Sequence, residues 1–145
     1  MGEAIISRMK LHPVDSFTTI HNYIDTENKI LRKGAVSAQA GETIIIPINM
    51  KDGALICRGR GNVDWNYTAP HGSGRVLCRS EAKELITLDE FKAEMEGVFT
   101  TSVNESTIDE SPMAYRRGDE ILNTIDPTAE VVERILPVYN FKASR

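Results

Sequence analysis

The sequence predicts an α+β fold, with a mixed β-sheet and with helices mainly in the second half of the chain. Runs rich in β-branched and aromatic residues lie before residue 60 and again near the C-terminus, and such runs are typical of strands. Helix-forming runs and capping signals lie between them, after residue 75. No expected strand is followed by the glycine spacing of a Rossmann or P-loop unit, which excludes those folds. The 145 residues fit one domain, and we expect residues 1–145 to form a single segment.

The expected strands follow one another in the first half of the chain. Residues 17–23, "FTTIHNY", favour a strand, and residues 30–31 begin a second short strand after the turn "DTENK". Residues 43–48 form the clearest strand, whose continuous apolar character indicates burial on both faces, with Pro47 at an edge or a strand end. The turn signal "KDG" then leads into a strand over residues 54–58.

A glycine-rich stretch separates these strands from the helices. Residues 59–75 hold four of the ten glycines, and a loop of this length within a domain is usually functional or disordered. Helices are expected over residues 76–85 and, from the capping box "TLDE", over residues 87–95. Ser111 or Asp119 is expected to cap further helical turns, and the ending "AEVVERILPVYNF" favours a strand.

Charge and hydropathy exclude several classes of protein. The formal net charge is -4, so no global positive field attracts the chain to nucleic acid or to a membrane. The longest apolar run, residues 44–48, is too short to span a bilayer, and the N-terminus lacks the apolar core of a signal peptide. Cys57 and Cys78 do not make a disulfide framework and are expected to pack as small apolar side chains. We therefore expect a cytoplasmic protein with reduced thiols and no membrane partner.

The stretch "APHGSGR" contains the candidate nucleophile, His71. A histidine in an isolated His-Gly pair more often makes only a local hydrogen bond in a turn. Here, however, Gly72 and Gly74 remove side chains, so that backbone N–H groups can approach a phosphate closely. Arg75 adds a guanidinium that matches phosphate oxygens. A neutral imidazole in these surroundings can attack phosphorus and carry a covalent nucleotidyl group.

Other polar and aromatic residues leave two interpretations open. His21 could be a metal ligand, but one histidine alone more often makes a hydrogen bond in a half-buried strand. The clusters Arg32–Gly34 and Arg58–Gly61 could contact the phosphates of an RNA backbone or could be solvated turns. Trp65 and Tyr67 could stack on bases or could anchor the glycine-rich loop in the core.

Five blocks of the sequence occur in the order found in one known family. They are "FTTIHNY" with its His-Asn pair, "LRKGAVSA", "APHGSGR" followed by "CRSEA", "DESPMAYRR", and the ending "PVYNFKA" with its near-terminal lysine. Together they resemble the C-terminal part of RtcB-type RNA ligases over nearly the whole chain. Ser73 replaces the alanine of the family's His-Gly-Ala-Gly-Arg hallmark, Cys78 replaces a serine and Arg116 a lysine. The block "PINMKDG" stands where many members have Pro-Gly-Ser-Met-Gly.

The resemblance implies a reaction and a role for individual residues. RtcB-type ligases use GTP and manganese to join RNA that ends in a 3′-phosphate or a 2′,3′-cyclic phosphate to RNA with a 5′-hydroxyl. His71 matches the histidine that becomes guanylylated, and His21 matches a manganese ligand. Tyr115 and Lys142 match residues that hold the guanine. Asn49, Ser73 and Gly74 match segments of the family that line the phosphates and the ribose of the nucleotide.

The resemblance also implies that further ligands are needed. The family's N-terminal portion carries Asp-x-x-Cys-Gly and Asn-His motifs that supply other manganese ligands, and neither motif occurs in this sequence. With His21 alone, the metal should bind weakly. We therefore expect the chain to be inactive as a ligase on its own and to require that portion or self-association. The alternative is a nonenzymatic fragment that binds a nucleotide or RNA, or an oligomerising remnant.

Overall fold

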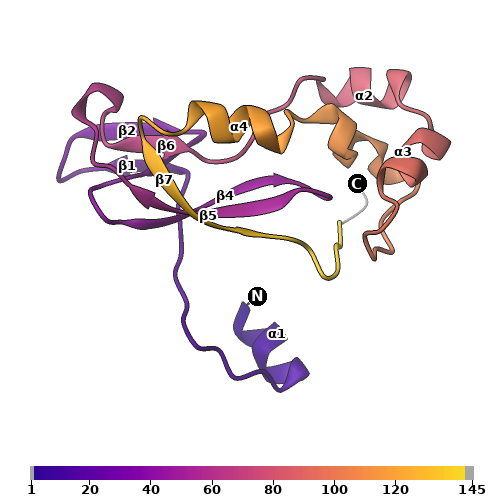
Figure 1. Ribbon diagram of the computed structural model, residues 1–145, viewed down its shortest axis with the longest axis horizontal. Helices are drawn as coiled ribbons and strands as arrows, with labels where there is room; N and C mark the ends of the chain where they lie inside the picture. Colours follow the sequence, from indigo (N-terminus) through magenta and orange to yellow (C-terminus); the bar gives the residue numbers. More distant parts are fainter. Residues whose placement is uncertain (1, 143–145) are drawn as a thin grey trace.

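The computed structural model describes residues 2–142 and confirms the α+β class (Figure 1). Its elements in chain order are α1 (Gly2–Met9), β1 (Asn22–Asp25), β2 (Ile30–Lys33), β3 (Ala35–Ser37), β4 (Thr43–Asn49), β5 (Gly53–Gly59), η1 (Val63–Trp65), β6 (Thr68–Pro70), α2 (Arg79–Leu85), α3 (Leu88–Glu94), η2 (Glu105–Glu110), η3 (Pro112–Ala114), α4 (Gly118–Thr124) and β7 (Ala129–Ile135). The η elements are single 3-10 turns or short 3-10 helices.

The main sheet has three strands in the order β4-β5-β7, and two smaller pairs join β1 to β2 and β3 to β6. Every pairing among these strands is antiparallel, so the sheet is antiparallel rather than mixed. Short turns account for two of these pairings, because they join β1 to β2 and β4 to β5, whereas a parallel neighbour would need a crossover connection of a dozen or more residues.

Two strand boundaries differ from those expected. The first strand begins at Asn22 rather than at residue 17, because its partner β2 offers only four residues for pairing, from Ile30 to Lys33. The C-terminal strand β7 ends at Ile135, which pairs with Ala54 of β5. Because β5 begins at Gly53, little of it remains beyond Ala54 for β7 to pair with. Residues 136–142 continue beyond the sheet without regular secondary structure.

The helix starts show where side-chain capping competes with propensity. The helix expected from residue 76 starts only at Arg79, because Cys78 caps it and the Glu81 carboxylate accepts a hydrogen bond from the Cys78 backbone N–H. The capping box at Thr87 is confirmed, and α3 follows it. Of the two expected caps, Ser111 is confirmed, because it caps the 3-10 turn η3. Asp119 is not a cap, because it lies within α4 and the residue at the N-cap position of α4 is Arg117.

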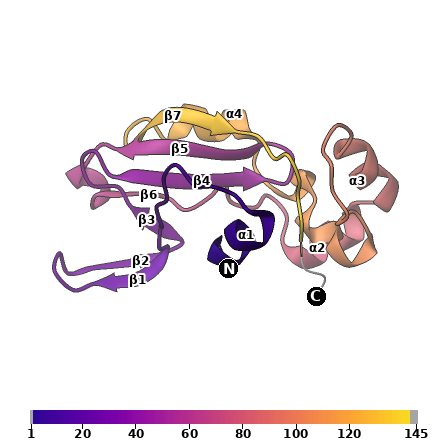
Figure 2. The same ribbon diagram turned by 90° about the horizontal axis from the view of Figure 1, so that it is seen from below.

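Two apolar clusters fill the interior. The first lies between the main sheet and α4, which runs over the strands in Figure 1, while Figure 2 shows the three strands of the sheet side by side. Its buried residues are Val36, Ala38, Ile44, Ile46, Ile48, Leu55, Cys57, Ala69, Ile121, Ile125 and Ala129. The second lies among α2, α3, η2 and η3 at one end of the sheet (Met50, Ala82, Ile86, Phe91, Met95, Ile108, Ala114). The helix α1 stands apart from both and has no buried residue.

Among residues 2–142, no helix combines the length and the hydrophobicity that crossing a membrane requires.

Candidate active site

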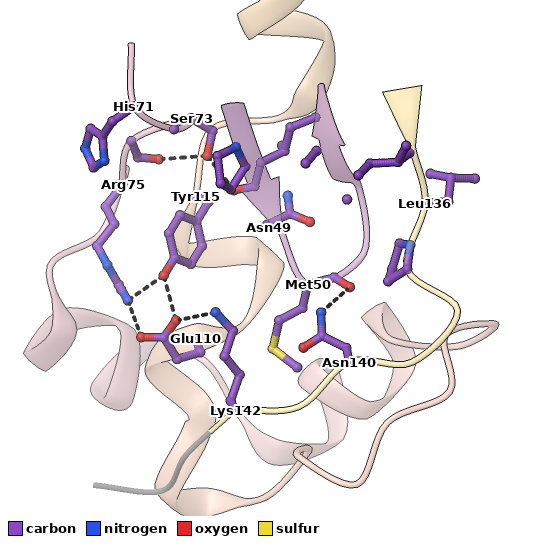
Figure 3. Close-up of a pocket in the computed structure, with 18 residues that line it drawn as sticks. Asn49, Met50, His71, Ser73, Arg75, Glu110, Tyr115, Leu136, Asn140 and Lys142 are labelled. Carbon is purple, nitrogen blue, oxygen red and sulfur yellow. Dashed lines mark hydrogen bonds and ion pairs between the residues drawn. The ribbon is translucent and has the colours of Figure 1, made fainter. Parts of the chain in front are cut away.

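A cavity of about 790 Å³ lies where the ends of β4 and β5 meet the loop after β6 and the C-terminal segment (Figure 3). Its walls include all seven residues that the sequence assigns to the nucleophile and the nucleotide: Asn49, His71, Ser73, Gly74, Arg75, Tyr115 and Lys142. Cavities of about 300–1,000 Å³ are typical of small-molecule sites. The fold therefore brings together residues that are as many as 93 positions apart in the chain, from Asn49 to Lys142.

The loop that carries His71 is held by its backbone. The strand β6 ends at Pro70, and the next residues run along the end of β4. The Ser73 N–H donates to the Pro47 carbonyl at 3.0 Å, and the Ser73 hydroxyl donates to the Ile48 carbonyl at 2.7 Å. A side chain at Gly72 would lie 3.2 Å from the Pro47 carbonyl oxygen, which is a tight contact, and Gly74 has φ +76°, a conformation that favours glycine.

The imidazole of His71 stacks on that of His21. The two ring centroids are 4.9 Å apart and the ring planes differ by 9°. A side chain at Gly34 would lie 3.5 Å from Cδ2 and Nε2 of the His71 ring, and the Gly34 N–H donates to the side chain of Asn22, next to His21. His71 is exposed overall, but partial desolvation of its ring and the neighbouring His21 lower the pKa of His71 below its ordinary value. Both effects favour the neutral imidazole, which has a lone pair available for attack.

The opposite side of the cavity is a cluster of ion pairs around Glu110 (Figure 3). Arg75 donates to the Glu110 carboxylate at 3.0 Å and to the Tyr115 hydroxyl at 2.8 Å, while its guanidinium lies 4.5 Å from the centre of the Tyr115 ring. The Tyr115 hydroxyl in turn donates to Glu110 at 2.9 Å, and the Lys142 ammonium lies 3.2 Å from the same carboxylate. Three of the predicted nucleotide-binding residues are therefore joined by one carboxylate.

The polar atoms of Asn49 are used within the β4–β5 turn. Its side-chain oxygen accepts from the backbone N–H groups of Lys51 and Asp52, and its amide donates to the Asp52 carboxylate. Gly53 follows with φ +78°, a conformation that favours glycine. Asn49 thus shapes the cavity wall by closing the hairpin, and its expected contact with a nucleotide stays a prediction.

Sequence reasoning missed two polar residues of the cavity, Glu110 and Asn140. The Asn140 amide donates to the Met50 carbonyl at 3.2 Å and so ties the C-terminal segment to the second apolar cluster. Its side-chain oxygen is buried and has no hydrogen-bond partner among the described residues. A signal for Glu110 was present in the block "DESPMAYRR", but only the fold shows that its partners are Arg75 and Lys142.

The basic clusters are largely structural. Arg32 is 2% exposed, forms an ion pair with Asp25 and donates to Thr68, which excludes contact with an RNA backbone at this position. Arg60 pairs with Asp126, and Arg58 donates to the Gly41 carbonyl. Arg32 is thus neither an RNA contact nor part of a solvated turn, whereas the exposed Arg58 and Arg60 are bonded to neighbouring segments of the chain.

The two cysteines differ in their exposure to solvent. Cys57 is buried in the first apolar cluster, where burial raises its pKa to about 11, as expected for a small apolar side chain. Cys78 is exposed at the start of α2, so the expectation that it packs inside a helix is wrong. The capping box described above is the reason for its position.

The described residues do not fit a manganese site by themselves. His21 and His71 are the two imidazoles near the cavity, and residues 2–142 contain no group of three or more His, Cys, Asp or Glu side chains placed to hold one metal ion. Manganese prefers oxygen ligands together with imidazole in a well-filled coordination sphere. A metal ion here would need ligands from another segment or another chain.

Comparison with known proteins gives the family. Residues 3–143 match the family model of tRNA-splicing ligase RtcB, and the chain belongs to this family. It is 36% identical over 119 residues to the RNA-splicing ligase RtcB of Escherichia coli K12, which covers 77% of this chain and 29% of that protein. It is 32% identical over 105 residues to the tRNA-splicing ligase RtcB of Aeropyrum pernix, which covers 68% and 22%, respectively. The chain thus spans less than a third of the length of these relatives.

Proposed function

We propose that this chain carries the nucleophile and part of the GTP site of an RNA ligase. The ligase would join RNA 3′-phosphate or 2′,3′-cyclic phosphate ends to 5′-hydroxyl ends through a guanylylated His71. The observation that carries this proposal is that His71, the glycine loop, Tyr115 and Lys142 line one and the same cavity. Membership of the RtcB family supports the same reaction, because its relatives are named for RNA splicing.

The chemistry follows from a neutral imidazole beside a phosphate-binding loop. A nitrogen of His71 forms a bond to the α-phosphorus of GTP, and the bond from that phosphorus to the leaving pyrophosphate breaks. A 3′-phosphate oxygen of the RNA then takes the GMP group, and the electron pair of the nitrogen–phosphorus bond returns to the imidazole. The RNA 5′-hydroxyl oxygen attacks the 3′-phosphorus, loses its proton and displaces GMP.

The cavity walls suggest how GTP would lie. Ser73 and Gly74 would place the phosphates beside His71, and Asn49 would lie near the ribose. Tyr115 and Lys142, on the other side of the cavity, would hold the guanine. Both outer nitrogens of Arg75 are already engaged by Glu110, Tyr115 and the Asp109 carbonyl. Arg75 would therefore act on a phosphate mainly through its nearby positive charge.

The manganese ion of the proposed reaction would need ligands that residues 2–142 do not supply. We propose that His21 contributes one ligand and that another polypeptide segment, or a second copy of this chain, contributes the others. Residues 1–145 would then act as one segment equivalent to the C-terminal portion of the ligase and would be inactive alone. Exposed apolar side chains near His21, such as Ile20, Ile24 and Leu31, fit a surface that such a segment covers. Free Cys57 and Cys78 fit the cytoplasmic setting that we propose.

The incomplete set of metal ligands favours one alternative, a nonenzymatic module that binds GTP or RNA. The two functions are separated by incubating the protein with manganese and GTP labelled at the α-phosphorus and by measuring the label that stays on the protein after denaturation. The assay is run with the chain alone and with the N-terminal portion of an RtcB relative added. Retained label supports the ligase segment, whereas GTP binding without retained label in both arms supports the alternative.

A further inference from the structure

We propose that Glu110 is a positioning residue for the nucleotide: its carboxylate fixes Arg75, Tyr115 and Lys142 as one unit before GTP enters. The inference rests on the proposed function, because it concerns residues that we assign to the GTP site. It assigns a role to a carboxylate that the sequence motifs did not single out.

The two carboxylate oxygens of Glu110 divide their partners evenly. One oxygen accepts from Arg75 at 3.0 Å and from Arg79 at 2.9 Å. The other accepts from the Tyr115 hydroxyl at 2.9 Å and lies 3.2 Å from the Lys142 ammonium. A carboxylate offers about four lone-pair positions, and these four contacts use them. Glu110 therefore cannot accept a hydrogen bond from a ligand unless one of these partners leaves.

The carboxylate stays charged in this position. Burial raises the pKa of Glu110, but the hydrogen bond from Tyr115 and the charges of Lys142 and Arg75 outweigh it, so that the pKa lies below its ordinary value. The side chain is only 16% exposed, so its ion pairs are shielded from much of the solvent. Partly buried, charge-assisted contacts of this kind are stronger than those of exposed surface pairs.

The partners of Glu110 come from three separate parts of the chain. Arg75 belongs to the loop of His71, and this loop joins the Tyr115 segment through a β-bridge and through the Arg116 N–H, which donates to the Gly74 carbonyl. Lys142 belongs to the C-terminal segment, where its backbone N–H donates to the Ser102 hydroxyl. Without Glu110, the cations of Arg75 and Lys142 would repel each other, and their side chains would regain rotational freedom.

A positioning role and simple electrostatics predict opposite effects on GTP affinity when the charge of Glu110 is removed. GTP is an anion, so removal of a negative charge from its site should strengthen binding if Glu110 only occupies donors that GTP needs. A positioning role predicts weaker binding, because the donors must then be ordered as the ligand binds. The sign of the change therefore decides between a positioning residue and a placeholder.

The experiment compares Glu110→Gln and Glu110→Asp with Glu105→Gln, which changes an exposed carboxylate on the same 3-10 helix. GTP affinity is measured by calorimetry under the conditions in which the wild-type protein, with any added segment, binds GTP. The Glu110 variants should bind GTP on the order of tenfold more weakly, the typical scale for losing a hydrogen bond to a charged group, and Glu105→Gln should bind as wild type. Equal or tighter binding by Glu110→Gln would overturn the proposal. The Asp variant keeps the charge and serves if the Gln variant does not fold.

A second measurement separates this inference from the proposed function. Burial and the Glu110 carboxylate raise the pKa of Tyr115 to about 12, so Glu110→Gln should lower the pKa of this phenol toward its ordinary value of 10.0. The titration is followed by NMR of ¹³C-labelled tyrosine without GTP. If wild type does not bind GTP, the proposed function fails, and an unchanged Tyr115 pKa would show that Glu110 does not hold this residue either.

Discussion

The two sides of the cavity are built by different forces. On the side of His71, the N–H and the hydroxyl of Ser73 donate to backbone carbonyls and hold the loop against the end of β4. On the side of Tyr115, the contacts are ion pairs among side chains that meet at Glu110. Hydrogen bonds between uncharged groups tolerate acid and salt, whereas ion pairs weaken when a carboxylate is protonated or screened. The nucleophile is thus held by the more resistant of the two constructions.

The largest expected effect comes from the apolar cluster beneath the ion pairs. Phe91 is fully buried there, among Met50, Ile108 and Ala114. Phe91→Ala should lower the free energy of unfolding by about 3–5 kcal/mol, because it removes a buried ring and leaves a cavity. Urea denaturation measures this change. The control is Phe141→Ala, whose side chain is exposed and whose replacement should change stability by about 0.5 kcal/mol or less.

A smaller effect is expected on the side of His71. Ser73→Ala removes the hydroxyl that donates to the Ile48 carbonyl, in a place where Ser73 is 5% exposed. The free energy of unfolding should fall by about 1–3 kcal/mol, the usual range when a buried group loses its partner. The label retained from GTP should fall as well, because Ser73 lies in the segment that we assign to the phosphates and its hydroxyl helps to hold that segment in place. A loss of labelling without any loss of stability would mean that the hydroxyl acts on the nucleotide directly.

The smallest effect is a difference in response to acid. The pKa of Glu110 lies below its ordinary value of 4.5, so the stability from its ion pairs is present above that pH and is lost as pH falls through the lower folded value. NMR signals of Arg75 and Tyr115 should therefore shift in acid while the Ser73 amide keeps its bonded position. If the signals of Arg75, Tyr115 and the Ser73 amide all shifted over the same pH range, the two sides of the cavity would be one cooperative unit.

The difference between the two sides also explains what the sequence could predict. The His71 loop is a short local motif, so its glycines and its histidine could be interpreted from neighbouring letters alone. The Glu110 cluster joins positions 75, 110, 115 and 142, and no local pattern states that they meet. The resemblance to RtcB ligases implied roles for Tyr115 and Lys142 and included Glu110 in a matching block, but it did not show that this carboxylate lies between them.

The fold shows the same division between local and distant information. The capping box at Thr87 and the turn "KDG" depend on adjacent residues and are confirmed. Strand ends depend on the partner strand, which explains why β1 begins at Asn22 and β7 ends at Ile135. The apparent basic cluster at Arg32 failed as a surface prediction because its partner, Asp25, lies across a hairpin that only the folded chain closes.

The central claim is that His71 takes the GMP group, and locating the adduct tests it most directly. The protein is incubated with GTP and manganese, with the N-terminal portion of an RtcB relative added, and is then cleaved with a protease and examined by mass spectrometry at neutral to alkaline pH. His71→Ala is the test variant and His12→Ala the matched control, since His12 is exposed and does not line the cavity. We expect GMP on the peptide that contains His71, its complete loss in His71→Ala, and its retention in His12→Ala. GMP on Lys142, or an adduct that persists in His71→Ala, would contradict the account.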